Sequence, residues 1–355
     1  MEVFWINLFL VYILSFLARY FAAPVSTGPI LIKPNAYFAF LAATILILVA
    51  GFQKNIGDTF FYMYSYETVY LTWDKIGFSA DFGFNLYQML LQRISNNPQL
   101  LVFITALITN SLIVLVLYKY SRMFELSLYV YITGGMYLTS MNGIRQFLAA
   151  AVFFAATKYI FDGNWKKYVI VVLFASTIHQ TALILIPIYF LVRRRAWTWE
   201  TFMILLFSVI MVMGFNQFTS ALFSAIEDTK YSEYKNFTEG GANVLRVVVY
   251  AMPVILAYMG REKLRNLFPQ SDCVVNMAIL GLVFMIISTQ NWIFARFTFY
   301  FGLYNLILIS WAVKLFTDKN QKFIYYTILV CYFIYYFYES VISLRIFYDS
   351  DFIKI

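Results

Sequence analysis

Charged side chains are scarce in this chain, at 12% of its 355 residues, whereas hydrophobic residues make up 62% and the mean hydropathy is +0.73. Apolar runs of nearly 20 residues recur along the whole length, and no polar block is large enough to form a separate soluble domain. Together these features exclude an ordinary soluble protein. They predict an all-α polytopic membrane protein whose residues 1–355 form a single transmembrane helical domain.

Residues that bind metals are also few. The chain has one histidine, His179, and two cysteines, Cys273 and Cys331, which lie far apart without CxxC or Cys/His spacing. A zinc site built from His and Cys ligands is therefore excluded, and we expect no metal or other cofactor. The net charge of +8 comes from basic clusters at helix ends, which indicates membrane topology and no nucleic-acid partner.

About ten transmembrane helices are expected, with basic clusters in the cytoplasm, both termini outside and two outer-face segments, 53–98 and 215–241. Within the first outer segment, residues 82–94 are too short to span and predict an interfacial or re-entrant helix. The expected spans lie at about Val3–Phe21, Ala36–Phe52, Leu100–Leu117, Leu126–Met141, Ile144–Phe161, Trp199–Gly214, Val244–Met259, Val274–Ser288, Ile293–Val313 and Phe323–Ile342.

Residues 166–195 fit this alternation only as a broken re-entrant hairpin. Lys166 and Lys167 precede the apolar stretch and three arginines, 193–195, follow it, so a single span would put three positive charges outside. We expect two short helices that enter and leave on the cytoplasmic side and break at 177–180, with His179 at the turn. Broken helices at membrane depth are tolerated where protein or a water-filled cavity satisfies the backbone, which points to a functional site.

Arg145 and Arg296 each follow closely after a tight outer turn. A guanidinium stays charged and makes bidentate hydrogen bonds to phosphate oxygens, so the two arginines are candidates to bind a diphosphate and stabilise it as a leaving group. Snorkelling at a helix end, or pairing with Asp58 or Glu67, explains each arginine as well.

His179 and Asp58 are the candidate catalytic bases. A histidine with an ordinary pKa can take a proton from an attacking hydroxyl near neutral pH. Either residue also has a structural explanation, because the histidine can satisfy broken backbone and the aspartate can form a turn or cap a helix before Thr59.

Four short stretches in this order resemble the EpsG-like, Wzy-type family of bacterial polysaccharide polymerases. They are Gly57-Asp58-Thr59 with Tyr62, Gly143-Ile144-Arg145-Gln146-Phe147-Leu148-Ala149, Ile178-His179-Gln180-Thr181-Ala182-Leu183, and Ala295-Arg296-Phe297 before Tyr300. The resemblance covers about residues 35 to 315. The Gln-Thr pair after the histidine departs from the small or hydroxyl residues common there.

The resemblance implies a metal-independent, GT-C-like integral membrane glycosyltransferase in the plasma membrane. Such an enzyme polymerises oligosaccharide repeat units carried on undecaprenyl diphosphate at the outer face. The resemblance implies contact with membrane lipid, and a chain-length regulator and a flippase as partners. It also implies catalysis by His179 or Asp58, diphosphate binding by Arg145 and Arg296, and substrate positioning by Thr59, Tyr62, Gln146, Gln180 and Tyr300.

Two other classes remain open. A flippase or transporter for lipid-linked oligosaccharides also needs buried arginines, but along a path through both leaflets. A membrane-bound O-acyltransferase also uses a histidine within a span, normally with an Asn or His partner that this sequence does not identify.

Overall fold

The computed structural model describes residues 1–355 except 25–31, 78–80, 216–239 and 355. The described part is mainly helical, as the composition predicts, with one two-stranded antiparallel ribbon formed by β1 (Ala23–Pro24) and β2 (Ile32–Lys33). Most of the expected outer segment 215–241 lies outside the described residues.

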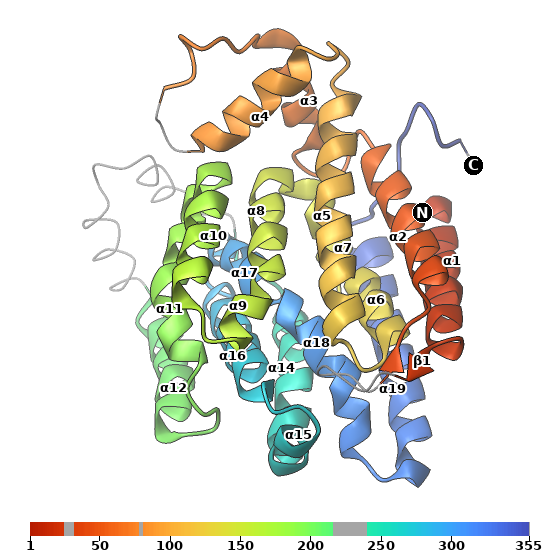
Figure 1. The fold of residues 1–355 in the computed structure, drawn as a ribbon, viewed down its shortest axis with the longest axis vertical. Helices are drawn as coiled ribbons and strands as arrows, with labels where there is room; N and C mark the ends of the chain where they lie inside the picture. The colour runs from red at the N-terminus through yellow and green to blue at the C-terminus, as the bar shows by residue number, and fades with distance from the viewer. Residues whose placement is uncertain (25–31, 78–80, 216–239, 355) are drawn as a thin grey trace.

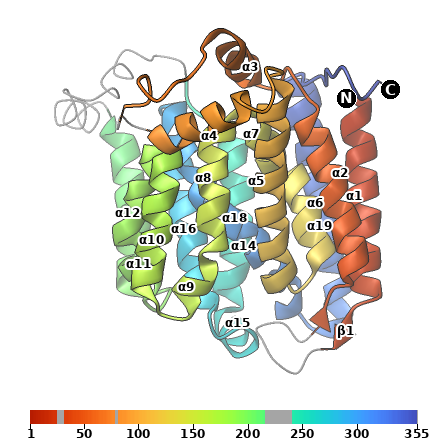
Figure 2. The ribbon, with the colours of Figure 1, turned by 45° about the horizontal axis from the view of Figure 1, so that its top comes forward.

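The helices run up and down a single bundle (Figures 1 and 2). Both views place the chain termini at the same end as α3 and α4, and the ribbon and α15 at the opposite end. The first half contains α1 (Glu2–Tyr20), α2 (Ala36–Gly51), α3 (Thr59–Thr68), α4 (Phe82–Gln92), α5 (Gln99–Tyr120), α6 (Phe124–Thr133), α7 (Met136–Asn142), α8 (Ile144–Ala155), α9 (Thr157–Phe161) and α10 (Trp165–Ile178).

The second half has more broken helices. Its elements are the 3₁₀ helix η1 (Gln180–Ile184), α11 (Leu185–Val192), α12 (Trp199–Met213), α14 (Val244–Met259), α15 (Arg261–Leu267), α16 (Ser271–Ile287), the 3₁₀ helix η3 (Trp292–Phe297), α17 (Thr298–Phe301), α18 (Leu303–Ala312), the 3₁₀ turn η4 (Val313–Leu315), α19 (Asp318–Tyr336) and the π-helix η5 (Phe337–Ser343).

Two described helices, α1 and α5, are long and apolar enough to cross a membrane by themselves, and the number rises to four if each of two bent helix pairs forms one span. The bent pairs are α14 with α15 and η3–α17 with α18–η4. Other expected spans are shorter or interrupted. The stretch expected to span at about 126–141 is divided into α6 and α7 at Gly134 and Gly135, where Gly135 adopts φ +86°. Glycine adopts this left-handed conformation without the steric penalty of a Cβ atom.

The chain reverses direction at His179, as the basic flanks predict. The Tyr168 hydroxyl, near the start of α10, donates to the Leu185 carbonyl at 2.6 Å, and the Tyr168 and Tyr189 rings lie 4.9 Å apart. Arg193, after α11, donates to the carbonyl of Ile160, before α10, at 3.1 Å. The start of α10 and the end of α11 therefore lie together at one end of the bundle, with the turn toward the other.

The expected short helix at residues 82–94 is present as α4. It lies across the end of the bundle that carries α3 (Figure 1), and Gly83 lies directly against Thr177 near the end of α10. A Cβ atom at Gly83 would be 2.3 Å from Thr177 Oγ1, so a glycine is needed for this approach. The contact brings the start of α4 to the turn of the hairpin.

Candidate active site at the α4 end of the bundle

Asp81, directly before α4, is bonded to the turn of the hairpin. Its Oδ1 accepts the backbone N–H of Gln180 at 2.7 Å, and its carboxylate lies 3.4 Å from His179 Nδ1 and 3.4 Å from Arg145 Nη1. The Asp81 side chain is only 2% exposed. One buried carboxylate thus joins the predicted base to one of the predicted diphosphate-binding arginines.

The protonation state of Asp81 determines which ring nitrogen of His179 carries the proton. Burial raises the pKa of Asp81, but the hydrogen bond and charge of His179, the Gln180 N–H and the charge of Arg145 together hold that pKa well below its ordinary value. An ionised carboxylate only accepts hydrogen bonds, so Nδ1 of His179 is the donor. In a neutral imidazole this tautomer leaves the lone pair on Nε2, which is the arrangement a general base requires.

Arg145 lies in the first turn of α8, one third exposed. Its guanidinium lies 5.8 Å from the centre of the Phe84 ring, and its Nε is buried without a hydrogen-bond partner in the described part of the chain. An unpaired buried donor is unfavourable, and an anion near the guanidinium would satisfy it.

The Gly57-Asp58-Thr59 stretch packs against the Asn142-Gly143 turn. Gly57 has φ +56°, and a Cβ atom there would lie 2.1 Å from the Asn142 side-chain oxygen. That oxygen accepts the backbone N–H of Asp58 at 2.9 Å, and the Thr59 hydroxyl lies 2.9 Å from the Met141 carbonyl oxygen. Thr59 is fully buried, so it fixes the position of the turn.

Arg296 lies in the 3₁₀ helix η3, whereas the sequence predicts a regular helix there. Its guanidinium lies 3.8 Å from Asp58 Oδ2 and 5.1 Å from the centre of the Trp292 ring. The pairing with Asp58 that the sequence left open is therefore present. Since Arg296 is 35% exposed and Asp58 44% exposed, the pair remains accessible.

Asp58 and Arg296 line a cavity of about 460 Å³. Arg145 and His179 are not among the residues that line it. The four predicted residues thus form two groups at the same end of the bundle, with Asp58 and Arg296 on the cavity and Arg145 and His179 around Asp81.

Gln146 and Tyr62 link these two groups. Gln146 Nε2 donates to the Arg296 carbonyl at 3.1 Å. Burial raises the pKa of the Tyr62 hydroxyl, and the charges of Arg145, Asp58, Arg296 and Asp81 all act on it, so Tyr62 lies within electrostatic reach of both groups.

The two remaining predicted residues have different surroundings. Tyr300 is fully buried and its hydroxyl contacts Thr181 Oγ1 at 2.8 Å, which joins α17 to η1. The Gln180 side chain is exposed while its backbone N–H is bonded to Asp81.

Sequence reasoning missed three charged residues near this site. Asp81 is one of four aspartates and glutamates in a mixed segment, and its partners lie 98 and 99 residues further along the chain. Arg246 and Glu339 form a partly buried ion pair that lines the cavity. The sequence did offer a signal for Glu339, because it is a charged residue within the expected apolar span Phe323–Ile342.

Among the residues that the structure describes, no group of three or more His, Cys, Asp or Glu side chains is arranged to hold a metal ion. Metal independence stays a prediction.

An all-α fold rich in apolar helices, with arginines, a histidine and carboxylates gathered at one end, defines the class as an integral membrane protein with a polar site. The sequence model of the EpsG family matches residues 36–350, so the chain belongs to the EpsG family. Membership indicates a polymerase-like role in polysaccharide biosynthesis. No curated relative and no solved structure matches the chain.

Proposed function

We propose that this protein polymerises oligosaccharide repeat units carried on undecaprenyl diphosphate, at the outer face of the plasma membrane. In this proposal the bundle makes ten transmembrane passes plus the hairpin of α10 and α11, in a GT-C-like arrangement. The α4 end faces outward and the basic loops face the cytoplasm. A flippase that delivers the units and a chain-length regulator are the expected partners.

The reaction transfers a glycosyl group. A hydroxyl of the terminal sugar on one lipid-linked unit attacks the anomeric carbon of the lipid-linked growing chain. A new glycosidic C–O bond forms, the bond from the anomeric carbon to the diphosphate breaks, and undecaprenyl diphosphate leaves with the bonding electron pair. The hydroxyl proton passes to a base of the protein.

The observation that most supports the proposal is that Arg145 has a buried N–H group without an acceptor in the described residues. Asp81 holds its Nη1 at 3.4 Å, yet its Nε is buried without an acceptor in the described residues and the side chain is one third exposed. A diphosphate oxygen would supply that acceptor. Arg296 is the second cation for the leaving group. Its backbone carbonyl accepts a hydrogen bond from Gln146 in α8, which connects it to the helix that carries Arg145.

His179 is the base that the Asp81 contact favours, because a carboxylate at Nδ1 leaves Nε2 as the proton acceptor. Asp58 remains the alternative, since it lines the cavity and His179 does not. Tyr62, Gln146 and Gln180 position substrate in this proposal. Thr59 and Tyr300 are buried, so in this proposal they position the substrate indirectly, by holding the backbone around the site.

The test is a cell-free reaction with purified protein in lipid nanodiscs, lipid-linked repeat units as substrate and the products separated by size. A ladder of oligomers on the lipid is expected. A flippase would instead move units across a vesicle membrane without joining them, and an O-acyltransferase would require an acyl donor. Absence of a ladder with intact units would contradict the proposal.

A further inference from the structure

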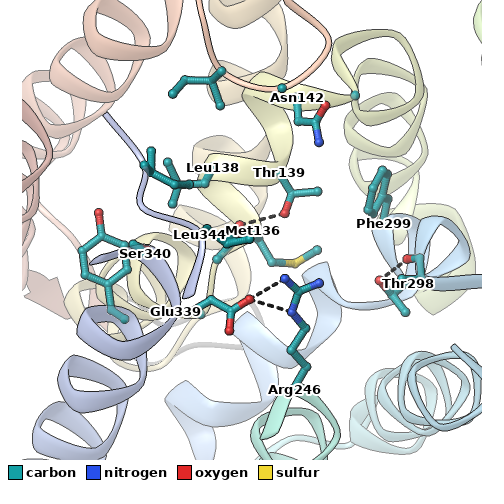
Figure 3. A pocket seen from close by; sticks show the side chains of 18 of the residues that line it. Met136, Leu138, Thr139, Asn142, Arg246, Thr298, Phe299, Glu339, Ser340 and Leu344 are labelled. Atoms are coloured by element: carbon teal, nitrogen blue, oxygen red, sulfur yellow. Dashed lines mark hydrogen bonds and ion pairs between the residues drawn. The ribbon is translucent and has the colours of Figure 1, made fainter. Parts of the chain in front are cut away.

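An ion pair occupies the side of the cavity away from Asn142 and Asp58. Arg246 in the first turn of α14 donates through Nε to Glu339 Oε1 at 2.8 Å, and its Nη2 contacts the same oxygen. Figure 3 shows the pair at the bottom of the cavity and Asn142 at the top, with Thr139 and Met136 between them. Asp58 lies beside Asn142, because the side-chain oxygen of Asn142 accepts the backbone N–H of Asp58.

The pair has unused hydrogen-bonding capacity. Both contacts from Arg246 go to Oε1, while Oε2 of Glu339 is buried without a hydrogen-bond partner in the part of the chain that the structure describes. The Glu339 side chain is 7% exposed, and Arg246 is 33% exposed and lines the cavity. A buried carboxylate oxygen without a donor is unfavourable, so the site is suited to a ligand that donates a hydrogen bond.

The charges of the pair indicate which ligand chemistry fits. Arg246 and Glu339 neutralise each other, and together they offer N–H donors and one carboxylate acceptor. A carboxylate or a fully ionised diphosphate ester could accept from Arg246 but has no proton to donate to Glu339, which would repel it. A neutral hydroxyl both accepts and donates, so it can satisfy both residues.

The rest of the cavity wall is rich in aromatic side chains, which offer apolar faces to the C–H groups of a sugar ring beside its polar hydroxyls. The aromatic lining residues are Tyr250, Trp292, Phe299, Tyr335, Tyr336 and Phe347.

We propose that Arg246 and Glu339 form a sugar-hydroxyl subsite, in which Arg246 donates to a hydroxyl and Glu339 both accepts from one and holds Arg246 in place. This inference rests on the proposed polymerase function and deepens it. The subsite lies across the cavity from Asp58, the ion-pair partner of Arg296, so a sugar is held at one end while the diphosphate is held at the other. The sugar comes from the acceptor unit or from the growing chain.

Direct binding tests the subsite without requiring transfer. The probe is the oligosaccharide that mild acid releases from the lipid-linked units of the host strain, titrated onto protein in nanodiscs by calorimetry. Glu339→Gln should weaken binding about 10- to 100-fold, the usual effect of losing a hydrogen bond to a charged group. A double variant, Arg246→Met with Glu339→Met, removes both charges together, which protects the fold from an unpaired buried charge, and should bind as weakly.

The matched control is Glu125→Gln. Glu125 is fully buried and pairs with Arg19, 3.0 Å away. Arg19 lies in the last turn of α1, next to the β1–β2 ribbon at the opposite end of the bundle (Figure 2), so this variant should keep wild-type sugar binding. Inorganic pyrophosphate is the second probe, and Glu339→Gln should bind it as wild type does.

Oligosaccharide binding at wild-type strength in Glu339→Gln and in the double variant would overturn the subsite, as would a wild type that binds no oligosaccharide. If Glu339→Gln lost pyrophosphate binding but kept oligosaccharide binding, the pair would be an anion site, and this result too would overturn the sugar-hydroxyl subsite. Sugar binding that depends on Glu339 in a protein that makes no ladder would refute the polymerase and leave the subsite standing. In polymerisation assays, a raised KM for added acceptor units or for preformed chains identifies the source of the sugar.

Discussion

Asp81 accepts the backbone N–H of Gln180 at 2.7 Å, although the two residues are 99 positions apart in the sequence. The bond fixes the turn of the α10–α11 hairpin to the start of α4, and the same carboxylate contacts His179 and Arg145. The orientation of the predicted catalytic groups therefore depends on one buried aspartate in a segment that sequence reasoning treated as an outer connection.

Asp81→Ala should lower the free energy of unfolding by about 1 to 3 kcal/mol, because it leaves the Gln180 N–H without its acceptor and Arg145 without its counter-charge. It should also abolish polymer formation. Thermal unfolding in detergent and the cell-free ladder assay measure the two effects. The matched control is Asp74→Ala, an exposed aspartate in the same segment, which should leave both unchanged. Wild-type activity in Asp81→Ala would show that the contact does not organise the site.

The stability that Asp81 contributes should depend on pH in one direction. Its pKa in the folded protein lies below the ordinary value of 3.8, so the contribution is fully present above about pH 4 and is lost as the pH falls further. The difference in unfolding temperature between wild type and Asp81→Asn should be constant from pH 5 to 8 and shrink below pH 4. A difference that shrinks already between pH 7 and 5 would mean that Asp81 is not the ionised partner.

Lys166→Cys and Arg194→Cys should be labelled by a membrane-impermeant thiol reagent only from the cytoplasmic side, because both ends of the hairpin lie at one end of the bundle. Both positions are exposed, and the natural Cys273 and Cys331 would first be replaced. Glu67→Cys in α3 is the control for the outer face. Labelling of Arg194→Cys from outside would contradict the re-entrant topology.

His179→Gln should slow polymerisation by about 10²- to 10⁴-fold, the range for losing a positioned base, with lipid-linked donor binding largely retained. Glutamine can keep a hydrogen bond to Asp81 but cannot take up a proton at neutral pH. Single-turnover rates and donor binding measured on the same preparation separate the two effects. An unchanged rate would make the histidine structural and leave Asp58 as the base.

The parts of the fold that sequence reasoning could predict are those fixed by local composition. Basic flanks predicted the reversal at His179, and the short apolar stretch at 82–94 predicted α4. The interruption at Gly134 and Gly135 was not predicted, because glycines are tolerated within apolar helices and their backbone conformation depends on packing.

The candidate site was predicted only in part for a related reason. Short motifs identify Arg145, His179 and Arg296, but the carboxylate that joins two of them comes from distant sequence. The same holds for Arg246 and Glu339, which are 93 residues apart and meet only when α14 packs beside η5. Such pairings depend on tertiary structure and leave no local pattern.

The central claim is that Arg145 and Arg296 hold the diphosphate leaving group. Its most direct test is the rate of ladder formation by purified protein in nanodiscs with EDTA present, for wild type, Arg145→Ala, Arg296→Ala and the exposed control Arg93→Ala. Wild type and Arg93→Ala should make the full ladder, while each of the other two should be slower by about 10²- to 10³-fold, with lysine at either position restoring only part. A full ladder from either alanine variant, or a wild type that works only after a divalent ion is restored, would contradict the account.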